Sequence, residues 1–246
     1  MTQRIIVLGG LSEIAEATCR LYAKEGAHLF LAGRDLSRLE AVAADLKLRG
    51  AGAVHVEAAD LVEIDPTDAL ARWSATLGGV DTLLLAYGSL GDQQLLERDL
   101  EAAGRLIDTN FRSAALWALA AAGRFEAARS GTLVVIGSVA GDRGRQSNYI
   151  YGATKAGLSV LVEGIAHRLA RSGARAVLIK PGFVDTIMTA HIEKKGVLWS
   201  SPEKVAALIR RAADRGAPIA YVPGYWRGIM AVIKTVPSSI FHRTKL

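Results

Sequence analysis

Short apolar runs alternate along this chain with segments that repeat their apolar residues at helical spacing. Continuous apolar runs of this length are typical of strands buried on both faces of a sheet. Their alternation with helices favours a parallel, doubly wound α/β sheet of about seven strands, a Rossmann-like fold. The predicted strands are Ile5–Leu8, Leu29–Ala32, Ala53–Val56, Thr82–Ala86, Thr132–Ile136, Ala176–Lys180 and Ile219–Val222.

The intervening segments predict six helices, and the whole chain reads as one domain, residues 1–246. A length of 246 residues suits a single α/β domain, and no linker or repeat divides it. The polar segment 183–200 has no regular pattern, so we expect it to be an irregular lid over the substrate. The predicted helices lie near residues 13–25, 36–48, 67–77, 102–129, 150–171 and 202–214.

The positive charge is concentrated at one end of the chain. The formal net charge is +6, and the segment from Arg215 onward carries five basic residues and no acidic one. The rest is nearly neutral, so the charge predicts no general polyanion surface and no nucleic-acid partner. No Cys, His and carboxylate cluster has metal-ligand spacing, so we expect no metal. The single cysteine and the lack of a long apolar run favour a cytoplasmic protein.

A glycine pair follows the first predicted strand and precedes a helix. Glycine there lets the backbone approach a pyrophosphate at the helix N-terminus, although a plain tight turn has the same pattern. The carboxylate of Glu13 must then point away from the phosphates. The predicted cofactor residues of this turn are Gly9, Leu11, Ser12, Glu13 and Ile14.

The end of the second predicted strand bears on the choice of cofactor. NAD-binding Rossmann enzymes tend to place an acidic residue there, whereas this strand ends at Gly33 and is followed by Arg34. A guanidinium at that place suits a 2′-phosphate, and Ser37 or Arg38 would assist. The alternative is that Arg34 and Arg38 are solvated residues at a helix start. We expect NADP(H) to be favoured over NAD(H).

Tyr151 and Lys155 are four residues apart, and therefore share one face of a predicted helix. Reducing a carbonyl requires a proton donor for its oxygen, and a nearby ammonium favours the phenolate form of a tyrosine. Ser138 stands at the tip of the preceding strand, where its hydroxyl can hold the substrate oxygen. A Tyr-x-x-x-Lys pair alone occurs often by chance, but here the strand-tip serine accompanies it.

With the glycine turn and Pro181-Gly182 after the sixth strand, these residues resemble the short-chain dehydrogenase/reductase family over nearly the full length of the chain. The resemblance implies that Ser138 orients the carbonyl and that Tyr151 is the acid/base. It also implies that Lys155 binds the nicotinamide ribose as well and that Asn110 holds a proton-relay water. Tyr151 and Lys155 are therefore predicted cofactor residues as well. The other cofactor-binding residues that the resemblance implies are Asp60, Leu61, Gly88, Pro181, Gly182, Val184 and Thr186.

Two departures from the family pattern weaken the cofactor assignment. In the family's Gly-x-x-x-Gly-x-Gly turn, Glu13 and Ala15 stand where the second and third glycines are expected. Of the family's Asn-Asn-Ala-Gly after the fourth strand, only Gly88 is present.

Rarer segments resemble one branch of the family, the reductases of decaprenylphosphoryl-2-keto-ribose. That resemblance implies a keto-sugar on a polyprenyl phosphate as substrate, with Arg143, Arg145, Lys194 and Lys195 either meeting its phosphate or serving as ordinary surface charges. Two alternatives stay open: a soluble carbonyl or 3-oxoacyl reductase acting on a small ketone, and a non-catalytic NADP-binding sensor. The family resemblance also implies a homodimer or homotetramer. The segments are Gly9–Ile14, Tyr87–Asp92, Val139–Arg145, Met188–His191 and Trp226–Phe241.

The C-terminal tail, residues 225–246, is basic and amphipathic. Trp226, Ile229, Met230 and Ile233 fall on one face of a predicted helix that Pro237 ends. This face either lies on the inner surface of an anionic membrane, as a peripheral contact, or packs on the protein itself or a partner subunit.

Overall fold

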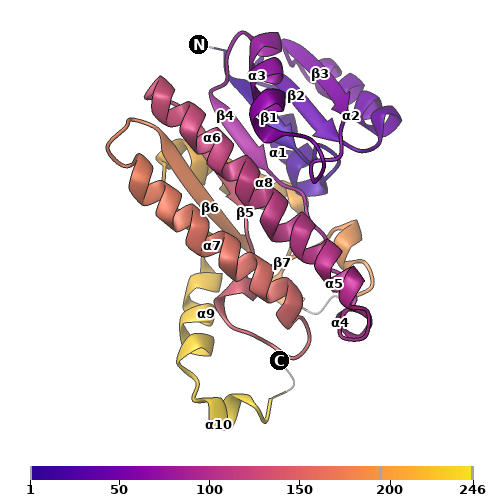
Figure 1. Cartoon of the computed structure of the whole chain (residues 1–246), viewed down its shortest axis with the longest axis vertical. Coiled ribbons are helices and arrows are strands. Elements are labelled where there is room, and N and C mark those ends of the chain that lie inside the picture. Colours follow the sequence, from indigo (N-terminus) through magenta and orange to yellow (C-terminus); the bar gives the residue numbers. More distant parts are fainter. Residues whose placement is uncertain (1, 194–195, 245–246) are drawn as a thin grey trace.

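Seven parallel strands form one sheet in the order β3-β2-β1-β4-β5-β6-β9 (Figure 1). This computed structural model describes residues 2–193 and 196–244. The order reverses between β1 and β4, and in such sheets ligands bind outside the carboxyl ends of the strands at that point. The predicted fold class is confirmed. The strands are β1 (Arg4–Leu8), β2 (His28–Gly33), β3 (Ala53–Ala58), β4 (Thr82–Leu85), β5 (Thr132–Ile136), β6 (Arg175–Pro181) and β9 (Ile219–Val222).

Helices cover both faces of the sheet and create two apolar cores. Because successive strand residues point to opposite faces, Ile5 and Val7 enter one core while Ile6 and Leu8 enter the other. The helices α1 (Glu13–Ala23), α2 (Leu36–Leu48) and α8 (Pro202–Arg215) pack on the first face. The helices α3 (Pro66–Leu77), α6 (Ala114–Ala128) and α7 (Tyr149–Leu169) pack on the second.

The long helix predicted near residues 102–129 is interrupted. It consists of α5 (Leu100–Ile107), a π-helical turn η1 (Asp108–Ser113) and α6. A short helix α4 (Gln93–Leu96), which the sequence did not predict, precedes it. A π-helical turn replaces i→i+4 by i→i+5 hydrogen bonds over a few residues, a stretch too short for the apolar pattern to reveal. The turn is important because it carries Asn110.

The lid is more regular than predicted. Its two ends pair as parallel strands, β7 (Phe183–Val184) and β8 (Trp199–Ser200), and the rings of Phe183 and Trp199 stack at 5.2 Å. Between them lie the 3-10 turns η3 (Ile187–Thr189) and η4 (Gly196–Leu198). The prediction of a wholly irregular segment is therefore wrong, because aromatic stacking and strand pairing close the segment at its base. Lys194 and Lys195 lie outside the described residues.

The tail forms α9 (Tyr225–Thr235) and α10 (Ser238–Phe241), drawn in yellow at one end of the molecule in Figure 1. Trp226 and Met230 are buried against Val139, with Ile229 and Ile233 partly buried beside them. The predicted apolar face thus packs on the protein's own chain. In the described ranges, no helix has the length and hydropathy needed to cross a membrane.

Candidate active site

The four predicted catalytic residues come from three segments at the carboxyl edge of the sheet. Ser138 follows β5 and caps the 3-10 turn η2 (Val139–Asp142), where its Oγ accepts a hydrogen bond from the Ala140 N–H at 3.0 Å. Tyr151 and Lys155 lie in the first two turns of α7. Asn110 lies in η1, which contacts α7.

Lys155 is buried with its ammonium next to the catalytic strand. Only 4% of the residue is exposed, and Nζ donates to the carbonyl oxygen of Ile136 at 3.1 Å. Nζ also lies 5.8 Å from the centre of the Tyr151 ring. Burial lowers the pKa of Lys155 to about 8. At neutral pH the group is therefore still mainly protonated, but it loses its proton far more readily than a solvated lysine.

Tyr151 is a neutral phenol in this structure. Burial raises the pKa of Tyr151, and a hydrogen bond with Ser138 opposes that shift without reversing it. The sequence predicted a lowered pKa for Tyr151, whereas here it is raised, with burial as the largest cause. A neutral phenol is the form that donates a proton in the reductive direction.

Asn110 is fixed by the loop after β4. Its Oδ1 accepts from the Ser89 N–H at 2.8 Å and its Nδ2 donates to the Ser89 carbonyl at 2.7 Å. A Cβ atom at Gly88 would lie 3.0 Å from Oδ1 of Asn110 and 3.6 Å from Nζ of Lys155. Glycine at position 88 therefore lets the amide and the ammonium lie close on either side of the backbone.

The turn after β1 has the shape that a pyrophosphate requires. Gly9 has φ +85°, and a Cβ atom there would lie 2.7 Å from that of Tyr87. The N–H groups of Gly9 and Gly10 both donate to the Ala32 carbonyl, which holds the turn against β2. The first amides of α1 have no acceptor within the helix, and the Ser12 side chain does not cap them. These amides fit an anionic dinucleotide.

The comparisons with known proteins agree with this geometry. A family model described as short chain dehydrogenase matches residues 3–196. The chain belongs to the short-chain dehydrogenase/reductase family. It is therefore an NAD(P)-dependent oxidoreductase.

Individual relatives agree in fold and in general activity. An uncharacterized oxidoreductase of Mycobacterium tuberculosis is 36% identical over 97% of this chain and 96% of its own length. A solved short chain dehydrogenase/reductase family protein is 28% identical, with TM-score 0.77 over 89% of this chain and 95% of that one. A structure provisionally named a betaketoacyl-ACP reductase is also 28% identical, with TM-score 0.75 over 90% of this chain and 96% of its own.

In this dehydrogenase/reductase, Tyr87 occupies the position before Gly88, where the family's Asn-Asn-Ala-Gly pattern has alanine. Its hydroxyl lies 2.6 Å from Oγ of Ser113, which donates to the Leu61 carbonyl at 2.5 Å. The indole of Trp117 donates to the same carbonyl at 2.8 Å. This buried chain of hydrogen bonds joins β4 to the segment after β3. The neighbouring Asp60 is exposed, and its carboxylate accepts from the Val62 N–H.

The end of β2 presents free guanidinium groups. Gly33 is buried, while Arg34 and Arg38 are exposed at the start of α2, whose N-cap is Asp35. Within residues 2–193 and 196–244, neither guanidinium has an ion-pair partner. Both are therefore available to a phosphate group.

The tail helix forms part of the wall of the site. A Cβ atom at Gly182 would overlap the indole ring of Trp226, which is buried. Phe183 contacts the same indole edge to face at 5.6 Å. Of the neighbouring predicted cofactor residues, Pro181 ends β6, Val184 is buried, and Thr186 begins η3. Sequence reasoning assigned Trp226 to the tail and missed its contact with the cofactor loop.

Arg143 serves the tail rather than a phosphate. Its guanidinium donates to the carbonyls of Ile233 and Val236 at the end of α9, and it lies 3.8 Å from the centre of the Phe241 ring. It therefore caps the helix and stabilises its C-terminal end. The alternative in which Arg143 meets a substrate phosphate is not supported by this structure. Arg145 contacts Met230 Sδ at 3.3 Å and keeps a buried Nε without a hydrogen-bond partner.

A buried ion pair fixes the loop that follows Ser138. Nζ of Lys180 lies 2.8 Å from Oδ1 of Asp142, and the Tyr221 hydroxyl donates to Oδ2 of the same carboxylate at 2.7 Å. Both charged side chains are almost fully buried. Because breaking such a pair leaves an uncompensated buried charge, it holds η2 firmly against β6 and β9.

Proposed function

We propose that this protein is an NADP(H)-dependent reductase that interconverts a ketone and a secondary alcohol. The observation that carries the proposal is the buried ammonium of Lys155 beside the neutral phenol of Tyr151, which is hydrogen-bonded with Ser138. Loss of one of these groups would be expected in a non-catalytic NADP-binding sensor. Ser138 caps η2 and Asn110 lies in η1, and both of these turns contact α7, which carries Tyr151 and Lys155.

The chemistry divides between the cofactor and three side chains. The bound cofactor supplies a hydride to the carbonyl carbon in the reductive direction. The Ser138 Oγ accepts from the Ala140 N–H, which fixes its position, and its proton would turn from the Tyr151 oxygen to the substrate oxygen when the ketone binds. Tyr151 gives its proton to that oxygen, which completes the alcohol. Lys155 favours the resulting phenolate by its charge. We also propose that the Asn110 amide, fixed by its two hydrogen bonds to Ser89, holds the proton-relay water through which Tyr151 regains its proton.

The choice of NADP(H) is supported by Arg34. Its exposed guanidinium follows the buried Gly33 that ends β2, and the nearest acidic side chain, Asp35, caps α2 by accepting from the Arg38 N–H. An arginine binds a phosphate more strongly than a neutral ribose hydroxyl, because its hydrogen bonds are then charge-assisted.

We propose a keto-sugar carried on a polyprenyl phosphate as the substrate. Support comes from the aromatic side chains at the base of the lid, Phe183 and Trp199, and from the basic tail beside them. A soluble 3-oxoacyl reductase is the second candidate, favoured by the likeness to the provisionally named betaketoacyl-ACP reductase. A screen of NADPH oxidation against keto-sugars, their polyprenyl-phosphoryl forms and 3-oxoacyl thioesters separates the two. Preference for the thioesters would overturn the sugar assignment.

A polyprenyl substrate requires contact with the membrane, and we propose that the tail supplies it at the inner membrane surface of a cytoplasmic protein. Since Trp226 and Met230 are buried, the membrane-facing residues would be Val232 and Ile240, which are 66% and 58% exposed. The exposed Arg227 and Lys234 lie on the same helix. We expect binding to anionic vesicles that weakens with salt and is reduced by Val232→Asp with Ile240→Asp. Equal sedimentation of wild type and variant would contradict this proposal.

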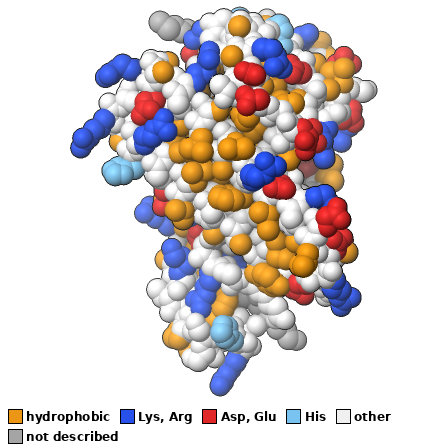
Figure 2. Space-filling model, in the orientation of Figure 1, with side chains coloured by type: hydrophobic (Ala, Val, Ile, Leu, Met, Phe, Trp, Pro, Cys, Tyr) orange, Lys and Arg blue, Asp and Glu red, His pale blue; other side chains and the backbone are white. Residues whose placement is uncertain are grey.

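We infer that copies of the chain associate through α6 and α7 as a homodimer or homotetramer. These helices carry the exposed apolar residues Leu116, Leu119 and Val160, and Figure 2 shows apolar side chains across this face. Contiguous apolar surface on a protein of this size is typical of an interface. Leu116→Glu with Leu119→Glu should lower the mass measured by analytical ultracentrifugation, and an unchanged mass would contradict the inference.

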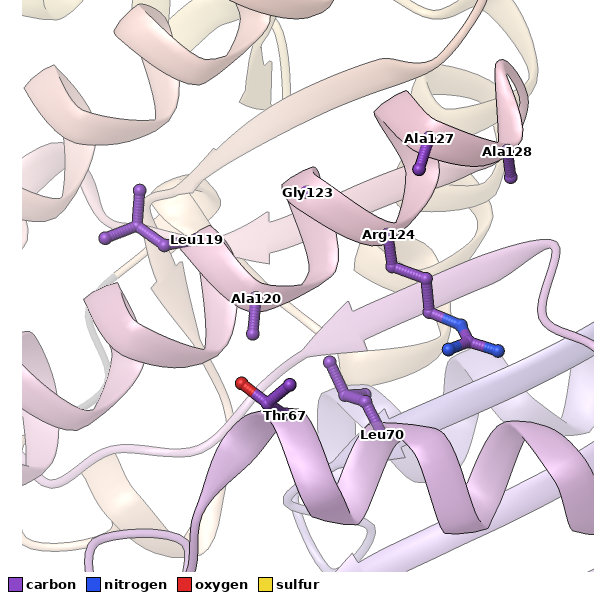
Figure 3. A pocket seen from close by; sticks show the side chains of 8 residues that line it. All are labelled: Thr67, Leu70, Leu119, Ala120, Gly123, Arg124, Ala127 and Ala128. Atoms are coloured by element: carbon purple, nitrogen blue, oxygen red, sulfur yellow. The ribbon is translucent and has the colours of Figure 1, made fainter.

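Beside this face a groove of about 570 Å³ runs between α3 and α6 (Figure 3). None of the predicted catalytic or cofactor residues lines it. Within it, the Arg124 guanidinium donates to Oγ of Ser74 at 2.5 Å. Its lining residues are Thr67, Leu70, Leu119, Ala120, Gly123, Arg124, Ala127 and Ala128.

A further inference from the structure

Glu13 connects the cofactor turn to the lid. It is the first residue of α1, and its Oε2 accepts a hydrogen bond from the N–H of Ile187, 174 residues further along, at 2.6 Å. Ile187 opens the 3-10 turn η3 inside the lid. The family pattern has a glycine where Glu13 stands, and a glycine has no side chain with which to make this bond. The carboxylate points away from the turn, as its sequence position predicted.

The bond matters because packing contributes little at this part of the lid. None of the three residues of η3 is buried, and Ile187 itself is 73% exposed. Local hydrogen bonds between Thr186 and Thr189 shape the turn but do not attach it to the sheet. An exposed turn without apolar burial opens readily. A charge-assisted hydrogen bond to its first amide is therefore a substantial part of what holds it.

The position of Glu13 also affects the cofactor. The N-terminus of α1 attracts negative charge, and Glu13 occupies it with a carboxylate where the amides would receive a pyrophosphate. Two anions at one helix end repel each other. Directing the carboxylate at the Ile187 N–H moves its charge toward the lid and gives it a hydrogen-bond donor there.

We propose that Glu13 is a positioning residue that fastens the lid to the cofactor turn and so sets the affinity for the ketone. This inference rests on the proposed function and on the expectation that the lid, described here for residues 183–193 and 196–200, covers the substrate. Glu13 does not touch the reacting atoms. It orders the lid over the site at the expense of some affinity for the cofactor.

Two variants separate the effect of the hydrogen bond between Glu13 and Ile187 from the effect of the negative charge on Glu13. Glu13→Gln removes the charge but keeps an oxygen that accepts from Ile187, whereas Glu13→Ala removes both. Glu16→Ala is the matched control, since Glu16 lies in the same first turn and pairs with Arg20 of α1 instead of the lid. Circular dichroism first establishes that each variant is folded.

The first readout is hydrogen exchange of a peptide spanning residues 183–193 in the cofactor-free protein. We expect Glu13→Ala to speed exchange of the Ile187 amide about tenfold, as loss of a charge-assisted hydrogen bond implies. Glu13→Gln should change it less than about threefold, since a neutral hydrogen bond remains, and Glu16→Ala should leave it unchanged. Exchange in Glu13→Ala equal to that of wild type would overturn the proposal, as would an equal increase in Glu16→Ala.

The second readout is steady-state kinetics with NADPH and a reducible ketone. Glu13→Ala should raise KM for the ketone about fivefold while kcat changes less than twofold, and Glu13→Gln should keep KM near that of wild type. The dissociation constant of NADPH should fall two- to fivefold in both variants, because a like charge has been removed. If wild type reduces no ketone, the proposed function fails, but the exchange experiment still decides whether Glu13 holds the lid.

Discussion

Residues 132–169 and two peripheral segments, residues 183–193 and 225–244, border the candidate site, yet they are held in different ways. The first segment is fixed by buried groups: Lys155 on the Ile136 carbonyl, and the η2 turn through the Asp142–Lys180 pair. The peripheral segments are attached through a few buried side chains, such as Trp226 and Met230, and through contacts nearer the surface, including the Glu13–Ile187 bond and the Arg143 cap on α9. The reacting side chains are thus held by more buried contacts than the parts suited to select a substrate.

The same division appears in the comparison with known proteins. The family model matches residues 3–196 and ends before β8 and the tail. The predicted catalytic residues all lie inside the matched range, whereas Trp226, which covers Gly182, lies outside it. A family match therefore predicts the reaction class of this chain better than its substrate.

The largest expected effect falls on residues 132–169. Tyr151→Phe removes only the phenolic oxygen, so turnover should fall at least about 10²-fold because the proton donor is lost. Tyr149→Phe is the matched control on the same helix, since Tyr149 is exposed and should tolerate the change. The measurement is kcat for NADPH oxidation with the best ketone of the screen. Near-normal turnover in Tyr151→Phe would rule out the proposed mechanism.

Lys155→Met should abolish activity and yet stabilise the fold. The pKa of Lys155 falls from 10.5 to about 8 on folding, which corresponds to a cost of about 3 kcal/mol for the buried charge below pH 8. Losing the hydrogen bond to Ile136 offsets about 1 kcal/mol. Urea unfolding at pH 7 should therefore show a gain of about 2 kcal/mol.

The way in which the free energy of unfolding changes with pH provides a second check on Lys155→Met. As the pH rises from about 8 to 10.5, the folded wild type loses its charge while the unfolded chain keeps it, so the cost disappears. The advantage of the variant should shrink over that window. A variant less stable than wild type at pH 7 would contradict the account of Lys155.

Arg34→Asp should weaken NADPH binding about 10- to 100-fold, because charge-assisted hydrogen bonds contribute roughly 1.5–3 kcal/mol and the new carboxylate repels the phosphate. NADH binding should change little. Arg98→Asp makes the same change of charge at an exposed arginine outside the predicted site and serves as control. Fluorescence titration measures both dissociation constants, and tighter binding of NADH than NADPH by wild type would refute the NADP(H) assignment.

The smallest expected effect concerns the tail. Arg143→Ala removes the cap from the carbonyls of Ile233 and Val236 and the contact with Phe241, a loss of about 1–2 kcal/mol to the end of α9. Hydrogen exchange should quicken in residues 225–241 and stay constant in residues 149–169. Equal quickening in both would show that the two regions are not held independently.

The sequence predicted those parts of the molecule whose structure follows from a pattern among neighbouring residues. Apolar runs identified the strands, and the spacing of Tyr151 and Lys155 predicted correctly that they share one helix, α7. The π-helical turn around Asn110 has no such signal, because it involves only a few residues inside a longer helical segment.

Contacts between distant segments could not be predicted. The bond from Glu13 to Ile187 spans 174 residues, and the Arg143 cap depends on how α9 docks against η2. The raised pKa of Tyr151 is likewise a consequence of burial, which the order of the residues does not express.

The central claim is that a buried Lys155 beside Tyr151 makes this site a reductive one. The measurement that tests it most directly is the pH profile of kcat for ketone reduction by NADPH, from pH 6 to 10. We predict a plateau that falls as the pH rises through about 8, because Lys155 then loses the charge that favours the phenolate left by proton transfer. A rate that stays constant or increases across pH 8 would contradict the account.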